Sequence, residues 1–330
     1  MTEQELLDPA RQPSREGVLR AMEKVAAILP PTPLLPLEIE GRTLWCKAEM
    51  LQPIGSFKIR GAWHRLSDLT PAERERGVIA VSSGNHAQGV AWAAQRLGVA
   101  ATIIMPENAP KAKIAATKAL GAQVVLYQRP GQDRDAIAAE MVERTGATLV
   151  HPFANPWVIE GQGTLGVEAA AQLKERGIDG PHHIIACCGG GGLSAGLGLA
   201  LPDARLSIVE PEGWDDVIRS LASDDILSVT DQTHATDCDA LQTPHSFPLN
   251  MNVLRGRVHS GASVTPKEIA TAMRLVFERL HLVVEPGGAA ALAAVLAGKI
   301  EPEGVTLVTL SGGNADWTTY SRLIDAAEGT

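Results

Sequence analysis

The sequence is poor in the features that mark membrane, secreted and nucleic-acid-binding proteins. It has no stretch of about 20 apolar residues that could span a bilayer. Residues 1–20 are polar and contain no apolar signal core. Basic residues (29 Lys and Arg) are outnumbered by 38 acidic ones, and no long block of either sign occurs. We therefore expect a cytoplasmic protein without a membrane or nucleic-acid partner.

Cysteine is scarce as well. The four cysteines are Cys46, Cys187, Cys188 and Cys238, and the chain has no pair of CxxC units. This argues against a zinc site built from cysteines and against a disulfide framework. Cys187 and Cys188 end an apolar run, so we expect them to be buried thiols.

The chain does have a large apolar fraction, 45% of 330 residues, which is enough core for one or two domains. From residue 78 onward, short apolar runs alternate with segments of helical periodicity. Strands are predicted at residues 78–81, 101–105, 123–127 and 148–151, and helices at 86–97, 109–120 and 133–144. Such a series predicts a parallel sheet covered on both faces.

A second alternating series surrounds this unit. Helices are predicted at residues 18–29, 59–66, 164–176, 193–200, 265–280 and 287–297, and strands at 44–47, 184–187, 206–209 and 305–310. Thr265, Pro266 and Glu268 form a capping box that begins one of these helices. Residues 211–260 show no regular pattern and are predicted to be irregular. The predicted fold class is α/β, with two open, mostly parallel twisted sheets and helices on both faces.

The stretch GSFKIRGA, residues 55–62, is the first candidate for chemistry. Lys58 follows a flexible Gly55-Ser56 approach, and Phe57 could lie against a flat ring. A desolvated lysine has a lowered pKa and becomes a nucleophilic amine that can react with a carbonyl. Taken alone, Lys58 is more simply an ordinary surface lysine.

Two further loops combine a strand end with the start of a helix. Residues 82–86 (SSGNH) offer backbone N–H groups to a carboxylate or phosphate, although simple helix capping accounts for them equally well. His86 at a helix start is more often structural than catalytic. Residues 189–192 are four consecutive glycines, whose backbone could wrap a single phosphate; a tight turn is the alternative. They do not form GxGxxG, which argues against a dinucleotide.

Residues 210–216 (EPEGWDD) follow a third strand and are rich in carboxylates. Such a turn could bind Mg²⁺, Mn²⁺ or Ca²⁺, or could simply be a solvated acidic turn. Glu285 precedes an alanine-rich helix, and Ser311 follows the last strand, where a hydroxyl could contact a ring nitrogen. In open parallel sheets, ligands bind at the carboxyl ends of strands. An imine-forming lysine, a phosphate cup and a ring-nitrogen partner together are what pyridoxal 5'-phosphate requires.

With these motifs in family order over about residues 30–316, the chain resembles the serine racemase and serine/threonine dehydratase family. These are fold-type II pyridoxal-phosphate enzymes, related in fold to the tryptophan synthase β subunit. The resemblance also rests on residues 161–164 (GQGT) and 311–314 (SGGN). It implies a large cofactor-binding domain at residues 1–77 and 151–330, a small mobile domain at 78–150, and a homodimer.

The resemblance implies a role for each matching residue. Lys58 holds the cofactor covalently and later moves the Cα proton, and Ser83 is the candidate acid/base on the opposite face. The remaining cofactor contacts are Phe57, Asn85, Gly189, Gly190, Gly191, Gly192 and Ser311. The substrate carboxylate is held by Ser82, Ser83, Asn85 and His86. The divalent cation is bound by Glu210, Asp216 and the main-chain carbonyl of Trp214, where Trp214 replaces a smaller residue.

The implied activity is β-elimination from L-serine, L-threonine or a 3-hydroxy amino acid such as 3-hydroxyaspartate, giving a keto acid and ammonia. Because a serine at 311 cannot hold the ring nitrogen protonated, we expect prompt elimination over transamination. The alternative is a serine racemase, or an enzyme with both activities. A non-catalytic cofactor carrier and a nucleotide-binding oxidoreductase are more distant alternatives. A second substrate carboxylate would need a cation, for which Arg60, Arg129 and His245 are candidates.

Overall fold

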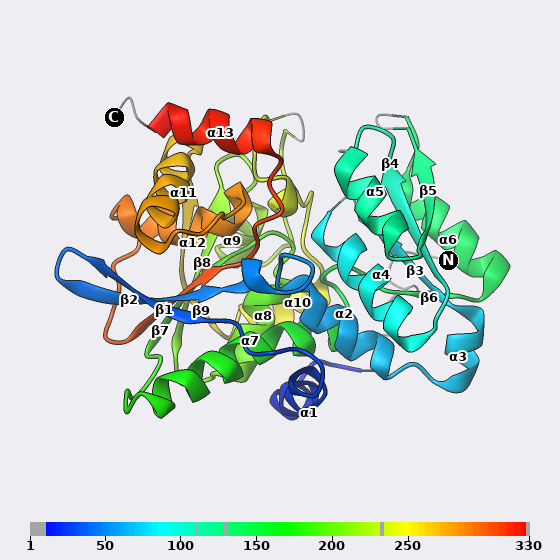
Figure 1. Ribbon diagram of the computed structural model, residues 1–330, viewed down its shortest axis with the longest axis horizontal. Helices are drawn as coiled ribbons and strands as arrows, with labels where there is room; N and C mark the ends of the chain where they lie inside the picture. Colours follow the sequence, from blue (N-terminus) through cyan, green and yellow to red (C-terminus); the bar gives the residue numbers. More distant parts are fainter. Residues whose placement is uncertain (1–10, 83, 110, 129–130, 232–233, 328–330) are drawn as a thin grey trace.

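The computed structural model describes residues 11–82, 84–109, 111–128, 131–231 and 234–327. Within these residues the chain forms a six-stranded and a four-stranded sheet, which lie in two lobes with helices around them (Figure 1). Neighbouring strands pair parallel except at one edge of the larger sheet. The predicted α/β fold with two mostly parallel sheets is therefore confirmed.

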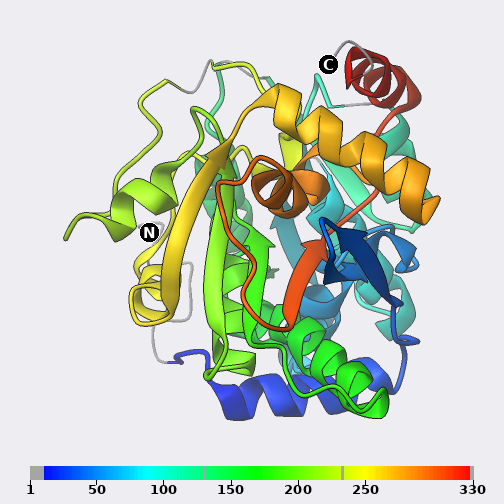
Figure 2. The same cartoon turned by 90° about the vertical axis from the view of Figure 1, so that its left-hand side faces the viewer.

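The large sheet has the strand order β1-β2-β10-β7-β8-β9, and its strands lie side by side in Figure 2. The antiparallel pair is β1 with β2. Its strands are β1 (Leu34–Ile39), β2 (Arg42–Ala48), β7 (His183–Cys187), β8 (Arg205–Pro211), β9 (Val258–Val264) and β10 (Thr306–Leu310). Every residue of β7 and β10 is buried, as expected for central strands covered on both faces.

The small sheet has the order β5-β4-β3-β6 and is parallel throughout. Its strands are β3 (Val78–Val81), β4 (Ala101–Pro106), β5 (Gln123–Tyr127) and β6 (Thr148–Leu149). They alternate with α4 (Asn85–Leu97), α5 (Lys111–Ala119) and α6 (Arg134–Thr145). These elements make up the cyan-to-green lobe on the right of Figure 1 and come from the region assigned to the small domain, whose boundaries stay a prediction.

The other helices of the described chain flank the large sheet or join the two lobes. They are α1 (Arg15–Ala26), α2 (Lys58–Ser67), α3 (Pro71–Arg76), α7 (Pro156–Glu175), α8 (Gly192–Ala200), α9 (Asp216–Leu221), α10 (Pro248–Leu254), α11 (Pro266–Leu280), α12 (Pro286–Leu296) and α13 (Trp317–Ala326), with the short 3-10 helices η1 (Glu49–Leu51) and η2 (Asp239–Leu241). Helix α2 packs against α4 of the small lobe and α7 of the large one, so it bridges the two.

Local capping signals set several helix ends as predicted. The Thr265 hydroxyl accepts from the Glu268 N–H at 3.3 Å, and the Glu268 carboxylate accepts from the Thr265 N–H at 2.7 Å. This confirms the capping box that begins α11. Gly98 follows α4 with φ of 66°, a left-handed conformation that favours glycine at a helix end.

The prediction that residues 211–260 are irregular is wrong, because α9, η2, α10 and the start of β9 lie there. Between its terminal valines, strand β9 has only polar and small residues and it is partly exposed at the sheet edge, so it lacks an apolar run. The predicted helix start at residue 164 is also too late. Asn155 caps α7, accepting from the Val158 N–H at 3.2 Å, and Pro156 occupies the first turn.

The glycines of the GQGT motif lie inside α7 because two other helices cross it there. A Cβ on Gly161 would come within 2.5 Å of the Gly61 Cα on α2. A Cβ on Gly163 would come within 2.5 Å of the Gly196 carbonyl oxygen on α8. These glycines therefore permit close helix packing and do not break the helix.

No helix in the described ranges combines the length and the apolar character needed to cross a membrane.

Candidate active site

The predicted loops converge on one pocket between the two lobes. The loop at residues 82–86 follows β3 of the small sheet, whereas the glycine run follows β7 and Ser311 follows β10 of the large sheet. The pocket is lined by Phe57, Lys58, Ser82, Asn85, His86, Gly189, Gly190, Gly191, Gly192 and Ser311. Ser83, the predicted second acid/base, lies outside the described residues. Residues far apart in the chain thus meet in one cavity.

Lys58 is the first residue of α2 and is partly buried. Its amine donates to the Pro152 carbonyl oxygen at 2.8 Å. Burial lowers the pKa of the Lys58 amine to about 8, although the nearby Cys187 and Glu285 oppose that shift. At neutral pH a useful fraction of this amine is therefore unprotonated, as a nucleophile or general base requires.

Ser311 and the Lys58 segment are held together by the backbone. The Phe57 N–H donates to the Ser311 carbonyl oxygen at 3.1 Å, and Ser56 pairs with Gly312 as an isolated β-bridge. Ser311 is buried and lines the pocket, and its hydroxyl lies beside the Cys187 thiol, whose pKa burial raises. The predicted ring-nitrogen partner and the predicted cofactor lysine therefore face the same cavity.

The glycine run turns from β7 into α8, which begins at Gly192. Gly191 has φ of +85°, a conformation that favours glycine. A Cβ on Gly190 would come within 2.4 Å of the Phe153 ring, and one on Gly192 within 2.9 Å of the Phe153 Cβ. The backbone and the start of α8 therefore form a narrow cradle that side chains would fill, which suits an anion such as phosphate.

Asn85 begins α4 and belongs to a short polar chain that crosses the lobes. Its side-chain amide donates to Glu285 at 2.6 Å and accepts from the Asn314 amide at 2.7 Å. Burial raises the pKa of Glu285 to about 7, and one of its oxygens is buried without a partner among the described residues. No role for Glu285 was predicted from the sequence, but it lines the pocket and bonds Asn85 there.

His86 is oriented by its Nε2, which donates to the Val150 carbonyl oxygen at 2.8 Å. Burial, and then the charge of Lys58, lower the pKa of His86 to about 3, so the ring is neutral. These contacts favour the structural role predicted for His86. Its Nδ1, however, is buried and unpartnered in the described part of the chain. On the same loop, the Ser82 hydroxyl accepts from the Gly84 N–H at 3.2 Å.

Of the cations predicted for a second substrate carboxylate, the two that the structure describes, Arg60 and His245, do not line the pocket. Arg60 is wrong, because its guanidinium is fully buried between Glu49 and Glu168, away from the pocket. Arg129 lies outside the described residues, and His245 packs against Phe247 with ring centroids 5.2 Å apart and the ring planes tilted by 44°.

Lys113 from α5 and Arg134 from α6 line the pocket instead. Nothing in their local sequence distinguishes them from other helix-surface cations, so pattern reasoning missed them.

The predicted cation ligands lie apart from the pocket, at the end of β8 and the start of α9. Burial, then the Asp216 charge, raises the pKa of Glu210 well above its usual range. Burial raises the pKa of Asp216 to about 7, and its Oδ2 has no partner among the residues described. Trp214 is buried, with its indole N–H donating to the His234 carbonyl oxygen at 3.0 Å.

This carboxylate pair has the oxygen donors that Mg²⁺, Mn²⁺ or Ca²⁺ would use. Within the described ranges, however, no cluster of three or more Asp, Glu, His or Cys side chains could hold a metal. A cation there would need main-chain or water oxygens as well.

All four cysteines are free and buried, as predicted for Cys187 and Cys188. Both of these also line the pocket, which was not predicted from the sequence.

Comparison with known proteins agrees with this geometry. Residues 25–312 match the family model described as "Pyridoxal-phosphate dependent enzyme". An L-threo-3-hydroxyaspartate ammonia-lyase from Pseudomonas sp is 39% identical, over 94% of this chain and 98% of that protein. A serine racemase from Schizosaccharomyces pombe is 36% identical, over 94% and 97%.

Among solved structures, the threonine deaminase of T.th. superposes with a TM-score of 0.86 at 41% identity, covering 92% of this chain and 99% of that one. The expected resemblance and fold are thereby confirmed. With its match to the family model over most of its length, this chain belongs to the family of pyridoxal-phosphate dependent enzymes.

Proposed function

We propose that this enzyme is an ammonia-lyase that eliminates the β-hydroxyl of L-serine, L-threonine or 3-hydroxyaspartate. The products are a keto acid and ammonia. The observation that carries the proposal is the Lys58 amine, with a pKa lowered to about 8, in the same pocket as the glycine cradle and Ser311. The relatives named above as ammonia-lyases support the reaction type.

The pocket residues fit pyridoxal phosphate. The cradle at residues 189–192 has room only for backbone and would hold the phosphate, and Ser311 would contact the ring nitrogen. Phe57 would lie beside the ring and Asn85 near its phenolic oxygen. When bound, the cofactor supplies an electron sink for the negative charge left at the substrate's Cα.

Lys58 has two tasks in this proposal. Its unprotonated amine would join the cofactor and, once displaced by substrate, would accept the proton from Cα. Proton transfer needs a base whose pKa is near the working pH, and burial of Lys58 supplies that. Since Ser83 lies outside the described residues, its role as the acid/base on the opposite face stays a prediction.

The substrate carboxylate would bind the loop that opens α4, through its backbone N–H groups, that of His86 among them, and the side chains of Ser82 and Asn85. Lys113 and Arg134 would face a second carboxylate, as 3-hydroxyaspartate has. Lys113 already pairs with Asp239, whereas Arg134 pairs with its own neighbour Asp135, at 3.5 Å. Arg134 is therefore the freer of the two cations to meet a substrate.

This substrate assignment can be tested with Arg134→Gln. We expect kcat/KM for 3-hydroxyaspartate to fall about tenfold or more while that for L-serine changes little, because one charge-assisted pair contributes about 1.5–3 kcal/mol. Arg144→Gln, at the exposed far end of the same helix, is the matched control. Equal losses on both substrates would contradict the assignment.

We also propose a divalent cation at Glu210 and Asp216, with the Trp214 carbonyl as a third ligand. The Asp216 oxygen that has no partner among the described residues, and the repulsion between the two buried carboxylates, support it. A bound cation would keep both carboxylates ionised and stabilise the turn between β8 and α9.

The activity is tested by incubating the enzyme with each hydroxy amino acid, with and without a chelator, and measuring keto acid and both enantiomers. Keto acid as the main product supports the ammonia-lyase. D-serine as the main product would favour the racemase, an activity that the S. pombe relative carries in its name. A protein that takes up the cofactor but turns nothing over would be a carrier. The homodimer and the cytoplasmic location stay predictions.

A further inference from the structure

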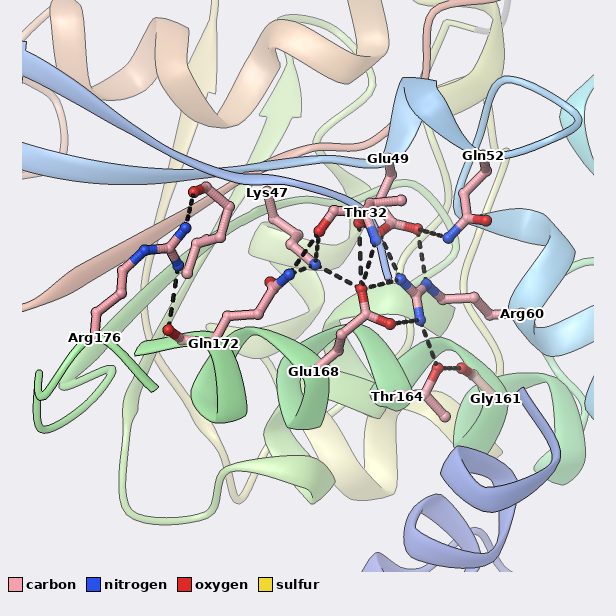
Figure 3. Close-up of polar contacts among 11 residues, drawn as sticks. Thr32, Lys47, Glu49, Gln52, Arg60, Gly161, Thr164, Glu168, Gln172 and Arg176 are labelled. Carbon is pink, nitrogen blue, oxygen red and sulfur yellow. Dashed lines mark hydrogen bonds and ion pairs between the residues drawn. The ribbon is translucent and has the colours of Figure 1, made fainter. Parts of the chain in front are cut away.

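Behind the pocket lies a buried cluster of polar and charged side chains, here called the Arg60 cluster (Figure 3). It brings together five parts of the chain: the connector before β1, then β2, η1, α2 and α7. Its members are Thr32, Lys47, Glu49, Arg60, Thr164, Glu168 and Gln172. Two cations face two carboxylates, so the charge is balanced where water is excluded.

Arg60 is the centre of this cluster and uses its whole guanidinium. Nε and Nη2 donate to the two Glu49 oxygens, both at 2.8 Å. Nη1 and Nη2 donate to the two Glu168 oxygens at 3.0 and 2.9 Å. Nη1 also donates to the Thr164 hydroxyl at 3.3 Å. Two planar forks therefore fix both the position and the orientation of the Arg60 side chain.

The same turn of α2 carries Lys58, on its other side. Residues two apart on a helix point about 200° away from each other. The Lys58 amine accordingly reaches Pro152 in the pocket, whereas the Arg60 guanidinium reaches η1 and α7. The cluster therefore holds the first turn of α2 on the side opposite to the one from which the Lys58 amine projects.

The start of α2 has little local support of its own. Its N-cap is Phe57, which provides no side-chain hydrogen bond, and its first turn has no acidic residue. Long-range contacts hold it instead: the Phe57 N–H on Ser311, the Gly61 N–H on the Gln162 side chain at 3.1 Å, and the Arg60 forks. Arg60 makes the most of these bonds.

We propose that Arg60 is a positioning residue for Lys58, acting through the first turn of α2. The inference rests on the proposed function of Lys58 as the lysine that joins the cofactor. Arg60 touches neither the pocket nor the Lys58 amine. The charged and titratable groups that face that amine come from other elements: Cys187 on β7, Glu285 before α12, His86 on α4 and His151 after β6. Arg60 therefore influences Lys58 by fixing the position of the first turn of α2.

The test is Arg60→Lys, which keeps the positive charge but loses both forks. The cofactor is removed from the full chain, pyridoxal phosphate is added back, and its covalent attachment is followed by visible absorbance at several pH values. A loosened first turn lets water reach the Lys58 amine. We expect the pH at which the attachment rate is half-maximal to rise by about one unit. At pH 7 the attachment should then be about tenfold slower.

Glu160→Gln is the matched control. Glu160 is a fully buried carboxylate on α7, and it also ties α7 to α2, through His64 at 3.3 Å. His64 lies six residues beyond Lys58, away from the first turn. We expect this variant to lower the melting temperature without moving the pH midpoint of attachment. Thr164→Val, which removes one Arg60 acceptor, should move the midpoint in the same direction as Arg60→Lys but by less.

The proposal is overturned if the midpoint moves equally in the Arg60, Thr164 and Glu160 variants, or in none of them. If Arg60→Lys does not fold, Thr164→Val against Glu160→Gln decides the question by the same comparison. Lys58→Ala distinguishes a failure of the proposed role of Lys58 from a failure of the proposed role of Arg60. If that variant still forms the covalent link, the proposed function of Lys58 fails, whatever the Arg60 variants do.

Discussion

The pocket contains the partly buried Lys58 and the Arg60 cluster contains the fully buried Lys47, and the two lysines differ in their partners. Burial lowers the pKa of both amines. Lys47 donates to the Thr32 carbonyl and the Glu168 carboxylate at 2.6 Å and to Gln172 at 2.8 Å, and the Glu168 charge offsets its burial. Lys58 donates to a single carbonyl, that of Pro152, within the described residues. Burial alone therefore does not make a lysine reactive. A reactive lysine must also have few hydrogen-bond acceptors and no carboxylate bonded to its amine.

The same contrast holds for polar atoms left without a partner. At the pocket, His86 Nδ1 and one Glu285 oxygen are buried and unpaired among the described residues. Near the Arg60 cluster, the Gln52 side-chain oxygen and the Gln162 side-chain nitrogen are likewise unpaired among the described residues, but no member of the cluster has such an atom. Unpaired buried groups cost about 1–3 kcal/mol each, so a ligand that bonds them gains affinity. The cluster is saturated, and the pocket is open to a ligand.

The strongest way to break the comparison is to remove each lysine in turn. Lys58→Ala should abolish covalent attachment of the cofactor and lower kcat by about 10³-fold or more, with the melting temperature kept. Lys47→Met should instead destabilise the fold by about 3 kcal/mol, because it leaves buried carboxylates undercompensated, and should keep the attachment. Absorbance, kcat and thermal melts measure the three effects. Loss of covalent cofactor attachment in both variants would contradict the proposed difference between Lys58 and Lys47.

The openness of the pocket can be tested at the glycine cradle. Gly190→Ala places a methyl group 2.4 Å from the Phe153 ring, so either the ring or the backbone must shift. We expect cofactor affinity to fall about tenfold to a hundredfold, measured by titrating cofactor into the cofactor-free protein. Gly256→Ala is the control, since its added Cβ would find the nearest atom at 3.8 Å. Equal affinity in both variants would exclude the cradle as the phosphate site.

The pH dependence of cofactor attachment sharpens the contrast between the two amines. Lys58 reacts only when unprotonated, and its pKa is lowered from 10.5 to about 8. The attachment rate should therefore rise about tenfold per pH unit below 8 and level off above it. A solvated lysine would instead show a rate that keeps rising toward pH 10.5. Measuring the rate from about pH 6 to 10 distinguishes these profiles.

The smallest expected effect concerns product partition. A carboxylate at position 311 would hold the ring nitrogen protonated, whereas the hydroxyl of Ser311 does not. Ser311→Asp should therefore raise the share of transamination by a few fold relative to elimination. The measurement is the ratio of cofactor that has accepted the amino group to keto acid formed. Ser311→Thr keeps a hydroxyl and serves as the control. An unchanged ratio in the Asp variant would remove the proposed role of the serine.

Much of the site could be predicted because its parts are local. A lysine after Gly-Ser, a run of four glycines and a serine after the last strand are each recognisable within a few residues, and all of them line the pocket. Lys113 and Arg134 could not be predicted, since their helices meet the pocket only through the packing of the small lobe. Arg60 was misassigned because its partner Glu168 lies 108 residues further along the chain.

By itself, the sequence determined the kind of chemistry and most element positions, because capping, periodicity and glycine conformation act over a few residues. It did not determine which charges would be neutralised. Only the tertiary structure decided that Lys47 would be bonded to several acceptors and that Lys58 would meet one carbonyl in the described part of the chain. The physical reason is that burial and pairing depend on groups brought together from distant parts of the chain, and these set whether an amine is inert or reactive.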